Sequence, residues 1–242
     1  KLVNDGLVSG WDDPRMATIC GMRRRGYPAE AVRAFVDKIG VSKAYSVIDY
    51  ALLESCVRDY LNENANRAMA VLRPLKVVID NYPEDKTETL EVEIHPEHPE
   101  MGTRKVTFGK TLYVEQEDFM AEPVKKYFRL FPGNEVRLKS AYLVTCNSYE
   151  TDENGEITLI RATADLETGG KNPADGRKIK GTIHWLSAKY SEETTLMLYD
   201  KLFTIENVND IPEDKTYNDY LNPDSLTVVS GAKVEPSLYE AK

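Results

Sequence analysis

The spacing of apolar residues changes once along this chain, between residues 65 and 69, and this change limits the folds open to it. Before this point, apolar residues recur at the 3.6-residue period of amphipathic helices. After it, short β-branched segments alternate apolar and polar residues, as half-buried strands do. Strands at short, even spacing with no long helix between them predict antiparallel barrels or sandwiches. We therefore expect an α+β chain with a small N-terminal helical subdomain followed by a β region.

Three helices are predicted before residue 65, and turn residues mark their ends. Asp13, which precedes a proline, predicts the N-cap of the first helix, and Gly26 predicts its end. The second helix is expected to begin at Pro28 and to end at Gly40. The third is expected to cover residues 46–64. The apolar stripe of the second helix consists of Val32, Phe35, Val36 and Ile39.

The predicted strands are short and are separated by turn residues. Asn154-Gly155 predicts a hairpin turn, because both residues tolerate a positive φ. Residues 167–178 contain three glycines and are the most loop-like long insertion. The predicted strands cover residues 75–79, 90–94, 105–108, 111–115, 135–139, 140–148, 157–164, 179–187, 194–198 and 226–229.

The net charge of −9 argues against nucleic-acid binding, which depends on neutralising phosphates. Residues 1–45, however, carry eight Lys or Arg and five Asp or Glu, a locally positive region that can still bind RNA. No apolar run approaches the ~20 residues of a membrane helix. The three cysteines have no CxxC spacing, which argues against a disulfide framework and a zinc site. Their usage fits a reducing compartment, so we expect a cytoplasmic protein.

The three histidines do not suggest a catalytic or metal site. His95 and His98 have HxxH spacing, but Pro96 and Pro99 exclude the regular helix that would aim both rings at one ion. A proline-rich connecting loop describes them better, and His184 is expected to be a packed strand residue. The sequence has no phosphate-binding glycine loop and no isolated carboxylate pair. We therefore expect no catalytic residue, no metal and no cofactor in this chain.

Arginines lie at two helix ends. Arg23, Arg24 and Arg25 fill the last turn of the first predicted helix, where cations meet the negative end of the helix dipole. On its own, such a triplet indicates a solvated helix end. Arg67 lies where helix gives way to strand, just after Asn62. Asparagines at this place cap helix ends, while an arginine there is also suited to hold an unstacked base.

Seven strings of this sequence resemble class I glutaminyl-tRNA synthetases, in the same order and at compatible spacing. They are GWDDPRMATICGMRRRGY, LESCVRDYLNENANRAMAVL, HPEHPEMGTRKV, GNEVRLKSAYLV, PADGRKIKGTIHWLSA, LYDKLF and EPSL. The resemblance runs almost end to end. It implies the tRNA-binding, anticodon-recognising part of an enzyme that attaches glutamine to tRNA-Gln with ATP.

The resemblance also implies a domain arrangement. Residues 1–65 would form a helical stem-contact subdomain. Residues 66–123 and 204–242 would form a proximal anticodon-binding β-barrel, and residues 124–203 a distal barrel inserted into it. The ATP-binding signatures of the family lie upstream of Lys1, and its last barrel strands lie beyond Lys242. We therefore expect a piece of a longer protein, inactive alone, that works with an upstream catalytic domain and tRNA-Gln, and not with DNA or a membrane.

Several residues stand where the family contacts tRNA. Anticodon or tRNA contacts are implied for Lys43, Asn62, Arg67, Pro96, Phe128, Arg129 and Arg137, and backbone contacts for Arg23, Arg24 and Arg25. In the family, Arg67 would hold the middle anticodon base, Arg129 would read the third and Arg137 the first. Guanidinium groups suit these roles, because they bond base edges and phosphates and also stack on bases.

Two positions depart from the family pattern. Phe128 stands where some members have lysine, so a charge contact would become a stacking contact. Glu97 stands where the family has a neutral side chain, beside Pro96.

Two other functions remain open from the sequence. A eukaryote-type glutamyl-tRNA synthetase would share the barrels and the WDDPR string, although ICGMRRRGY and DGRKIKGTIHWLSA favour the glutaminyl enzyme. A β-barrel interaction module that does not bind RNA is the other alternative, and the acidic net charge is its best support.

Overall fold

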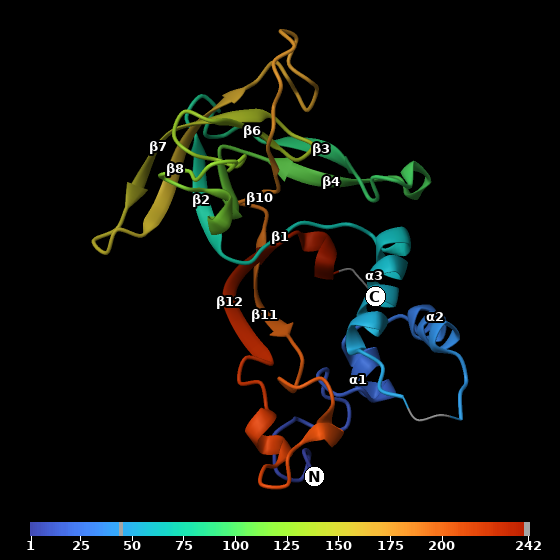
Figure 1. Cartoon of the computed structure of the whole chain (residues 1–242). Helices are drawn as coiled ribbons and strands as arrows, with labels where there is room; N and C mark the ends of the chain where they lie inside the picture. Colours follow the sequence, from blue (N-terminus) through green and yellow to red (C-terminus); the bar gives the residue numbers. More distant parts are fainter. Residues whose placement is uncertain (44–45, 240–242) are drawn as a thin grey trace. The chain divides into compact units, whose positions relative to one another are not determined.

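The computed structural model describes residues 1–43 and 46–239 and divides into two compact units. Unit 1 comprises Lys1–Ala65 and Met197–Val228, and unit 2 comprises Asn66–Leu196 and Val229–Lys242. Figure 1 shows three helices in unit 1 and a β-rich unit 2. The chain is therefore mixed α+β, as expected. Within the described residues, no helix combines the length and the apolar character needed to span a membrane.

The helices of unit 1 are α1 (Ile19–Arg24), α2 (Ala29–Ile39) and α3 (Tyr50–Asn64). The predicted end of the first helix is confirmed. Gly26 has φ +88°, its N–H donates to the Arg23 carbonyl at 3.0 Å, and the next N–H reaches the Met22 carbonyl at 3.0 Å. This pair of bonds is the Schellman motif. The predicted limits of α2, from Pro28 to Gly40, are also confirmed.

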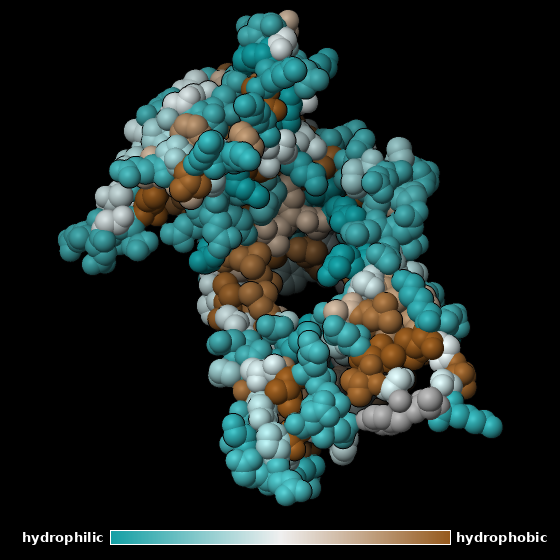
Figure 2. All heavy atoms as spheres, viewed as in Figure 1, coloured by the Kyte–Doolittle hydropathy of each residue, from teal (hydrophilic) through white to brown (hydrophobic). Residues whose placement is uncertain are grey.

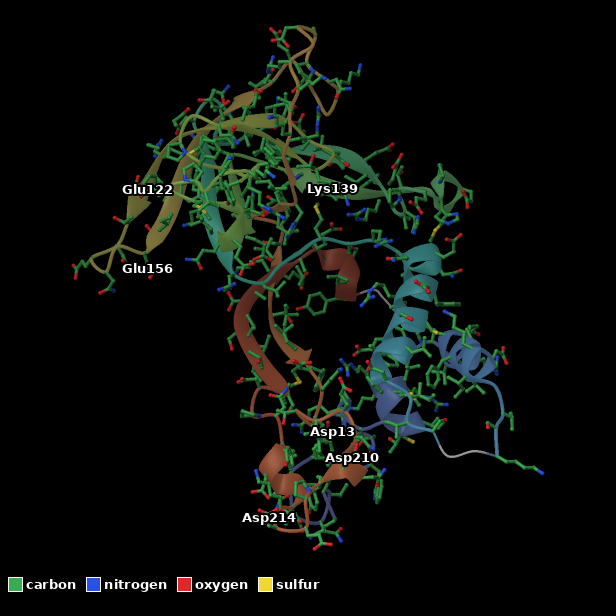
Figure 3. All side chains as sticks on the ribbon, viewed as in Figure 1. Asp13, Glu122, Lys139, Glu156, Asp210 and Asp214 are labelled. Atoms are coloured by element: carbon green, nitrogen blue, oxygen red, sulfur yellow. The ribbon has the colours of Figure 1, made fainter. Side chains whose placement is uncertain are left out.

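The predicted N-cap at Asp13 is wrong. Thr18 caps α1 instead, and its Oγ1 accepts the Gly21 N–H at 3.0 Å. Asp13, labelled in Figure 3, lies in the preceding turn and is 2% exposed. Its carboxylate accepts the Ser9 N–H at 2.8 Å and Arg15 Nη2–H at 2.8 Å. Charge-assisted bonds of this kind are about twice as strong as neutral ones, so the arginine outcompetes a helix end for this carboxylate.

The third helix begins four residues later than expected. Asp49 is its N-cap and accepts the Ala51 N–H at 2.9 Å. The two residues before Asp49 are Val47 and Ile48, whose β-branched side chains favour helix less than straight-chain residues do.

The core of the helices is narrower than the predicted stripe. It is built on the buried residues Ala31, Leu53 and Val57, with Met22, Tyr27, Val32, Phe35, Tyr50 and Tyr60 packed against them. Val36 and Ile39 belong to the predicted stripe but are 48% and 37% exposed. Figure 2 accordingly shows apolar surface over the helices of unit 1. Unit 1 also contains the short 3₁₀ helices η3 (Val208–Asp210) and η4 (Tyr217–Tyr220).

The strands agree closely with the predicted ranges. They are β1 (Ala70–Val71), β2 (Pro74–Ile79), β3 (Glu88–Glu93), β4 (Thr103–Phe108), β5 (Thr111–Glu115), β6 (Glu135–Leu138), β7 (Leu143–Thr151), β8 (Ile157–Asp165), β9 (Thr182–Ile183), β10 (Leu186–Ser187), β11 (Glu192–Tyr199) and β12 (Leu226–Val234). The 3₁₀ helices of unit 2 are η1 (Pro99–Met101), η2 (Gln116–Asp118) and η5 (Pro236–Tyr239). The predicted strand 179–187 is instead the two short strands β9 and β10, and His184 lies between them.

Seven strands form one curled sheet with the order β10-β5-β2-β8-β7-β6-β9, visible as a half-barrel in Figure 1. β3 and β4 form a separate hairpin, and β1, β12 and β11 form a three-stranded sheet. The expectation of purely antiparallel pairing is wrong, because β2 pairs with β8 and β6 pairs with β9 in parallel. The two strands of each pair are separated by other strands in the chain. The chain between them is therefore long enough for the crossover that parallel pairing requires.

The curled sheet mixes segments that the resemblance placed in two barrels. β2 and β5 come from the expected proximal barrel, and β6 to β10 come from the expected distal barrel. Two separate barrels are therefore not seen among the described residues. The division at residues 66–123, 124–203 and 204–242 stays a prediction.

The core of unit 2 lies inside the curl of the sheet. The Phe108 ring is fully buried, and its centroid lies 5.1 Å from the ring centroids of Tyr82, Tyr142 and Trp185. Edge-to-face aromatic contacts of this kind add about 0.5–1.5 kcal/mol beyond burial. The β3–β4 hairpin, which carries Phe108, is thus packed into the core of unit 2.

The hairpin between β7 and β8 is longer than the predicted two-residue turn. The strands end at Thr151 and Ile157, and only Gly155 of the Asn154-Gly155 pair has a positive φ, +83°. Asp152 Oδ1 accepts the N–H groups of Asn154 and Glu156, each at 2.9 Å. This side chain closes a five-residue loop, which a two-residue turn signal does not anticipate.

We expect Asp13→Asn to lower the free energy of unfolding of unit 1 by about 3 kcal/mol, because it breaks a buried ion pair. Arg15 holds the pKa of Asp13 well below its ordinary value. The stabilisation is therefore complete above the unfolded-chain pKa of about 4 and is lost as the pH falls toward the folded pKa. Denaturant titrations near neutral pH and at about pH 3 measure the difference between native and variant chains. An equal difference at both pH values would contradict this account.

Candidate nucleic-acid interface

The loop that carries Phe128 and Arg129 is fixed at both sides by the backbone. The Leu130 N–H donates to the Asp118 carbonyl at 2.9 Å, next to an isolated bridge between Phe119 and Leu130. On the other side, the Phe128 carbonyl lies so close to Gly181 that a β-carbon at position 181 would overlap it. Only glycine allows this approach, so the sequence holds the loop against the 180–182 segment.

The Phe128 ring is 48% exposed, and Lys180 lies over it. Lys180 Nζ is 5.3 Å from the ring centroid, within the range of a cation–π contact. A positive charge therefore stands beside Phe128 although position 128 itself carries none. Lys180 was not among the predicted site residues, because its partner lies 52 positions earlier in the chain and no local pattern links them.

Arg137 lies on the face of β6 opposite to the core, as the alternation predicted. Val136 and Leu138 are 0% and 1% exposed, whereas Arg137 is half-buried. Its Nη1 donates to the carbonyls of Gly170 and Lys171 at 3.1 and 2.9 Å, and its Nη2 donates to Asn172 Oδ1 at 3.1 Å. The guanidinium thus holds the tip of the long loop that the sequence predicted at 167–178.

Arg177 anchors the same loop by a second route. Its guanidinium donates to Glu135 at 2.8 and 2.9 Å, to Asp165 at 2.6 Å and to Asp175 at 2.7 Å. These carboxylates, Glu135 foremost, raise the pKa of Arg177 above its ordinary value. The group of four carries a net negative charge, so Arg177 positions the loop and does not offer free positive charge to a ligand.

The Arg129 side chain is bonded to a buried carboxylate, yet about half of its surface is exposed. Its Nη1 donates to Asp118 Oδ1; the Arg129 side chain is 51% exposed and the Asp118 side chain 2%. Asn134 Nδ2 also donates to the Arg129 carbonyl at 2.7 Å. Asp118 was missed in the sequence, because its arginine partner is eleven residues away and it lies among other acidic residues.

The 180–182 segment contacts the backbone of two predicted residues, Phe128 and Arg137. Arg137 donates its N–H to the Gly181 carbonyl at 2.9 Å, and β6 pairs Arg137 with Thr182. The same Gly181 packs on Phe128, which precedes Arg129. We call Phe128, Arg129, Arg137 and Lys180 the arginine surface. It combines a stacking ring with two guanidinium groups and a lysine.

Arg67 and the loop of Pro96 form a second group. The Arg67 N–H donates to the Ile94 carbonyl at 2.9 Å, directly before this loop. His95 is fully buried and its Nδ1 accepts the Glu97 N–H at 3.2 Å, while its ring centroid lies 4.7 Å from that of His98. The predicted connecting loop is confirmed, with Pro96 exposed. No group of three His, Cys, Asp or Glu side chains that could hold a metal occurs in the part of the chain the structure describes.

The other predicted contacts lie in unit 1. Lys43 and Asn62 are exposed, the latter in the last turn of α3. Arg23 and Arg24 are exposed too, and Arg24 Nη1 lies 3.0 Å from Asp12 Oδ2 in a solvent-exposed pair.

Arg25 differs from the other two members of the arginine triplet. Its side chain is 18% exposed, donates to the Tyr199 carbonyl at 3.2 Å and lies 3.8 Å from Glu54. Arg25 therefore has a structural role within unit 1.

Three family models match the chain. Two are described as the anti-codon binding domain of class I tRNA synthetases (E and Q), and they match residues 65–165 and 182–242. The third, the catalytic domain of the same class, matches residues 1–63. Phe128, Arg129, Arg137, Arg67 and Pro96 lie within the residues matched by the first anti-codon binding model, and Lys180 lies between the two matches.

Similar curated proteins are glutamine–tRNA ligases of bacteria. The ligase of Bradyrhizobium diazoefficiens is 53% identical over 241 residues, which is 100% of this chain and 42% of that protein. The ligase of Aliivibrio salmonicida is 53% identical over 242 residues, and that of Vibrio cholerae is 52% identical over 242, each covering 100% of this chain and 43% of the relative. The chain thus spans less than half the length of these relatives. It belongs to the class I (E and Q) tRNA synthetase family and corresponds to the anticodon-binding region of glutamine–tRNA ligases.

Proposed function

We propose that this chain binds tRNA-Gln and recognises its anticodon, as part of a ligase that joins glutamine to that tRNA with ATP. The observation that carries this proposal is the arginine surface, in which the backbones of Phe128 and Arg137 contact the 180–182 segment and Arg129 follows Phe128 in the chain. Sequence-specific RNA recognition uses unstacked bases held by aromatic rings and guanidinium groups. The four residues supply both kinds of group.

Each member of the arginine surface has a distinct role in this proposal. The half-exposed fork of Arg129 donates to the third anticodon base, and the exposed ring of Phe128 stacks on a base. Lys180 provides a cation for a phosphate beside that ring. Arg137 reads the first base, and its bonds to Gly170 and Lys171 exchange for bonds to RNA.

The Arg67 group serves the middle base. The Arg67 N–H donates to the Ile94 carbonyl, and the exposed Pro96 follows two residues later. Asn62, in the last turn of α3, is a separate tRNA contact of unit 1 in this proposal. Glu97 makes this loop more acidic than the neutral residue of the family does, so we expect the middle base to be bound mainly through Arg67.

Residues of unit 1 provide affinity without sequence preference. Arg23, Arg24 and Lys43 are exposed cations in the positive N-terminal region, suited to phosphates, which carry no sequence information. Arg25 contributes less, because its guanidinium is engaged within unit 1.

ATP and glutamine are bound by other parts of the ligase in this proposal, and the chain alone is inactive. Only residues 1–63 match the catalytic-domain model. We further propose a cytoplasmic location and a completed proximal barrel in the full-length enzyme, with residues 124–203 as its distal insertion.

Replacing Arg24 by Ala should weaken the binding of all tRNAs to a similar extent. Loss of one phosphate contact should flatten the slope of log K against log salt by about one unit. Salt titrations with cognate and non-cognate transcripts measure the slope. Lys38→Ala is the control, since Lys38 is 51% exposed against 53% for Arg24 and is likewise paired with a carboxylate. A loss confined to one tRNA species would refute the backbone role, and no binding even at low salt would favour a non-RNA module.

Arg129→Ala should cost about 1–3 kcal/mol of binding free energy when the third anticodon base is guanine, the worth of a good bidentate base contact. The cost should shrink when that base is changed to cytosine, the base expected for the glutamyl alternative. A double-mutant cycle between Arg129 and this base at fixed salt gives the coupling energy. Arg161→Ala is the matched control, because Arg161 is 44% exposed and paired with Asp80. A coupling energy within error of zero would show that Arg129 reads no base.

A further inference from the structure

Asp118 is a buried carboxylate in a segment that main-chain hydrogen bonds also hold. It ends η2, and its side chain is 2% exposed. The segment around it is held by main-chain bonds, with the Leu130 N–H on the Asp118 carbonyl at 2.9 Å and the Met120 N–H on the Leu130 carbonyl at 3.1 Å. These bonds do not involve the carboxylate and would hold the loop without it.

The carboxylate is also incompletely satisfied. Oδ1 accepts from Arg129, but Oδ2 is buried without a hydrogen-bond partner in the described parts of the chain. A buried acceptor without a hydrogen bond destabilises the folded state, and more so when it is charged. The stability of the fold therefore does not explain why residue 118 is an aspartate. We explain the aspartate by its effect on Arg129.

The geometry of the pair gives that explanation. A guanidinium has five N–H donors in a rigid fork. The bond to Asp118 fixes one edge of the Arg129 fork at the buried side, while half of the side chain stays exposed. An arginine held in this way loses less rotamer entropy when it binds a base than a mobile surface arginine does.

The pair also changes the charge that RNA meets. Asp118 and Arg129 together are neutral, so this arginine attracts phosphates weakly compared with an unpaired one. A ligand gains from Arg129 chiefly through correctly placed acceptors, such as the O6 and N7 atoms of guanine.

We propose that Asp118 is a positioning residue for anticodon recognition: it aims the Arg129 fork at the third base and suppresses binding of the same arginine to phosphates. This inference rests on the proposed function. It adds that the selectivity of Arg129 depends on a buried carboxylate that need not touch the RNA.

The test uses Asp118→Asn, which keeps the shape of the side chain and removes its charge. Dissociation constants are measured for tRNA-Gln transcripts with guanine or cytosine as the third anticodon base, over a range of salt. We expect the preference for guanine to fall about tenfold, within the range of one bidentate contact. Binding of the cytosine transcript should be unchanged or tighter, and the salt slope should steepen by about one unit, because a cation is released.

A structural role for Asp118 predicts a different result, namely equal weakening with both transcripts. That outcome, or an unchanged guanine preference, would overturn the inference. Asp80→Asn is the matched control, because Asp80 forms an aspartate–arginine pair with Arg161 at 2.5 Å in the same unit. It should leave the guanine preference unchanged.

Two further variants keep the test decisive. Asp118→Glu retains the charge and displaces the carboxylate by one methylene group, so it should lower the guanine preference without changing the salt slope. An unchanged preference in this variant would count against the inference even if Asp118→Asn fails to fold. If Arg129→Ala abolishes the preference and the Asp118 variants keep it, the inference alone fails. If Arg129→Ala also keeps it, the proposed role of Arg129 fails first.

Discussion

The arginine–carboxylate pair is the interaction on which this acidic chain most depends. In unit 1 the Arg15–Asp13 pair has side chains 13% and 3% exposed, and Arg15 also donates to Ser225 Oγ at 3.1 Å. In unit 2 the Arg104–Glu235 pair is 11% and 4% exposed and joins segments 131 residues apart. Buried pairs of this kind are costly to break from one side, so Arg15 and Arg104 are committed to the fold.

The same interaction decides which arginines can serve RNA. Arg177 is engaged by three carboxylates, and Arg25 by the Tyr199 carbonyl and Glu54, so both offer less positive charge to RNA than an unpaired arginine does. Arg129 is paired but half-exposed, and Arg137 is bonded to loop carbonyls that RNA acceptors can replace. A net charge of −9 is therefore compatible with anticodon recognition, because a few positioned guanidinium groups matter more than the total charge.

Local sequence patterns correctly predicted the features that depend on neighbouring residues, such as helix ends and the alternating burial of a strand. The Gly26 and Gly40 helix ends and the burial of Val136 and Leu138 around Arg137 follow from φ preferences and a period of two. The predictions failed where a distant partner decided the outcome. Asp13 binds Arg15 and therefore does not cap α1. No local sequence pattern links the partners in the parallel β2–β8 and β6–β9 pairs. The same is true of the Asp118–Arg129 pair. The family resemblance supplied the site residues, but not the contacts that position them.

Amide hydrogen exchange with and without a tRNA-Gln anticodon stem-loop tests most directly whether the arginine surface is the anticodon site. Exchange rates report local opening free energies segment by segment. The account predicts that binding slows exchange in residues 124–137 and 166–182, with little change in the buried strands β2 and β5. The account would be contradicted if binding slowed exchange elsewhere but in neither of these two segments. It would also be contradicted if the RNA slowed exchange in no segment even at low salt.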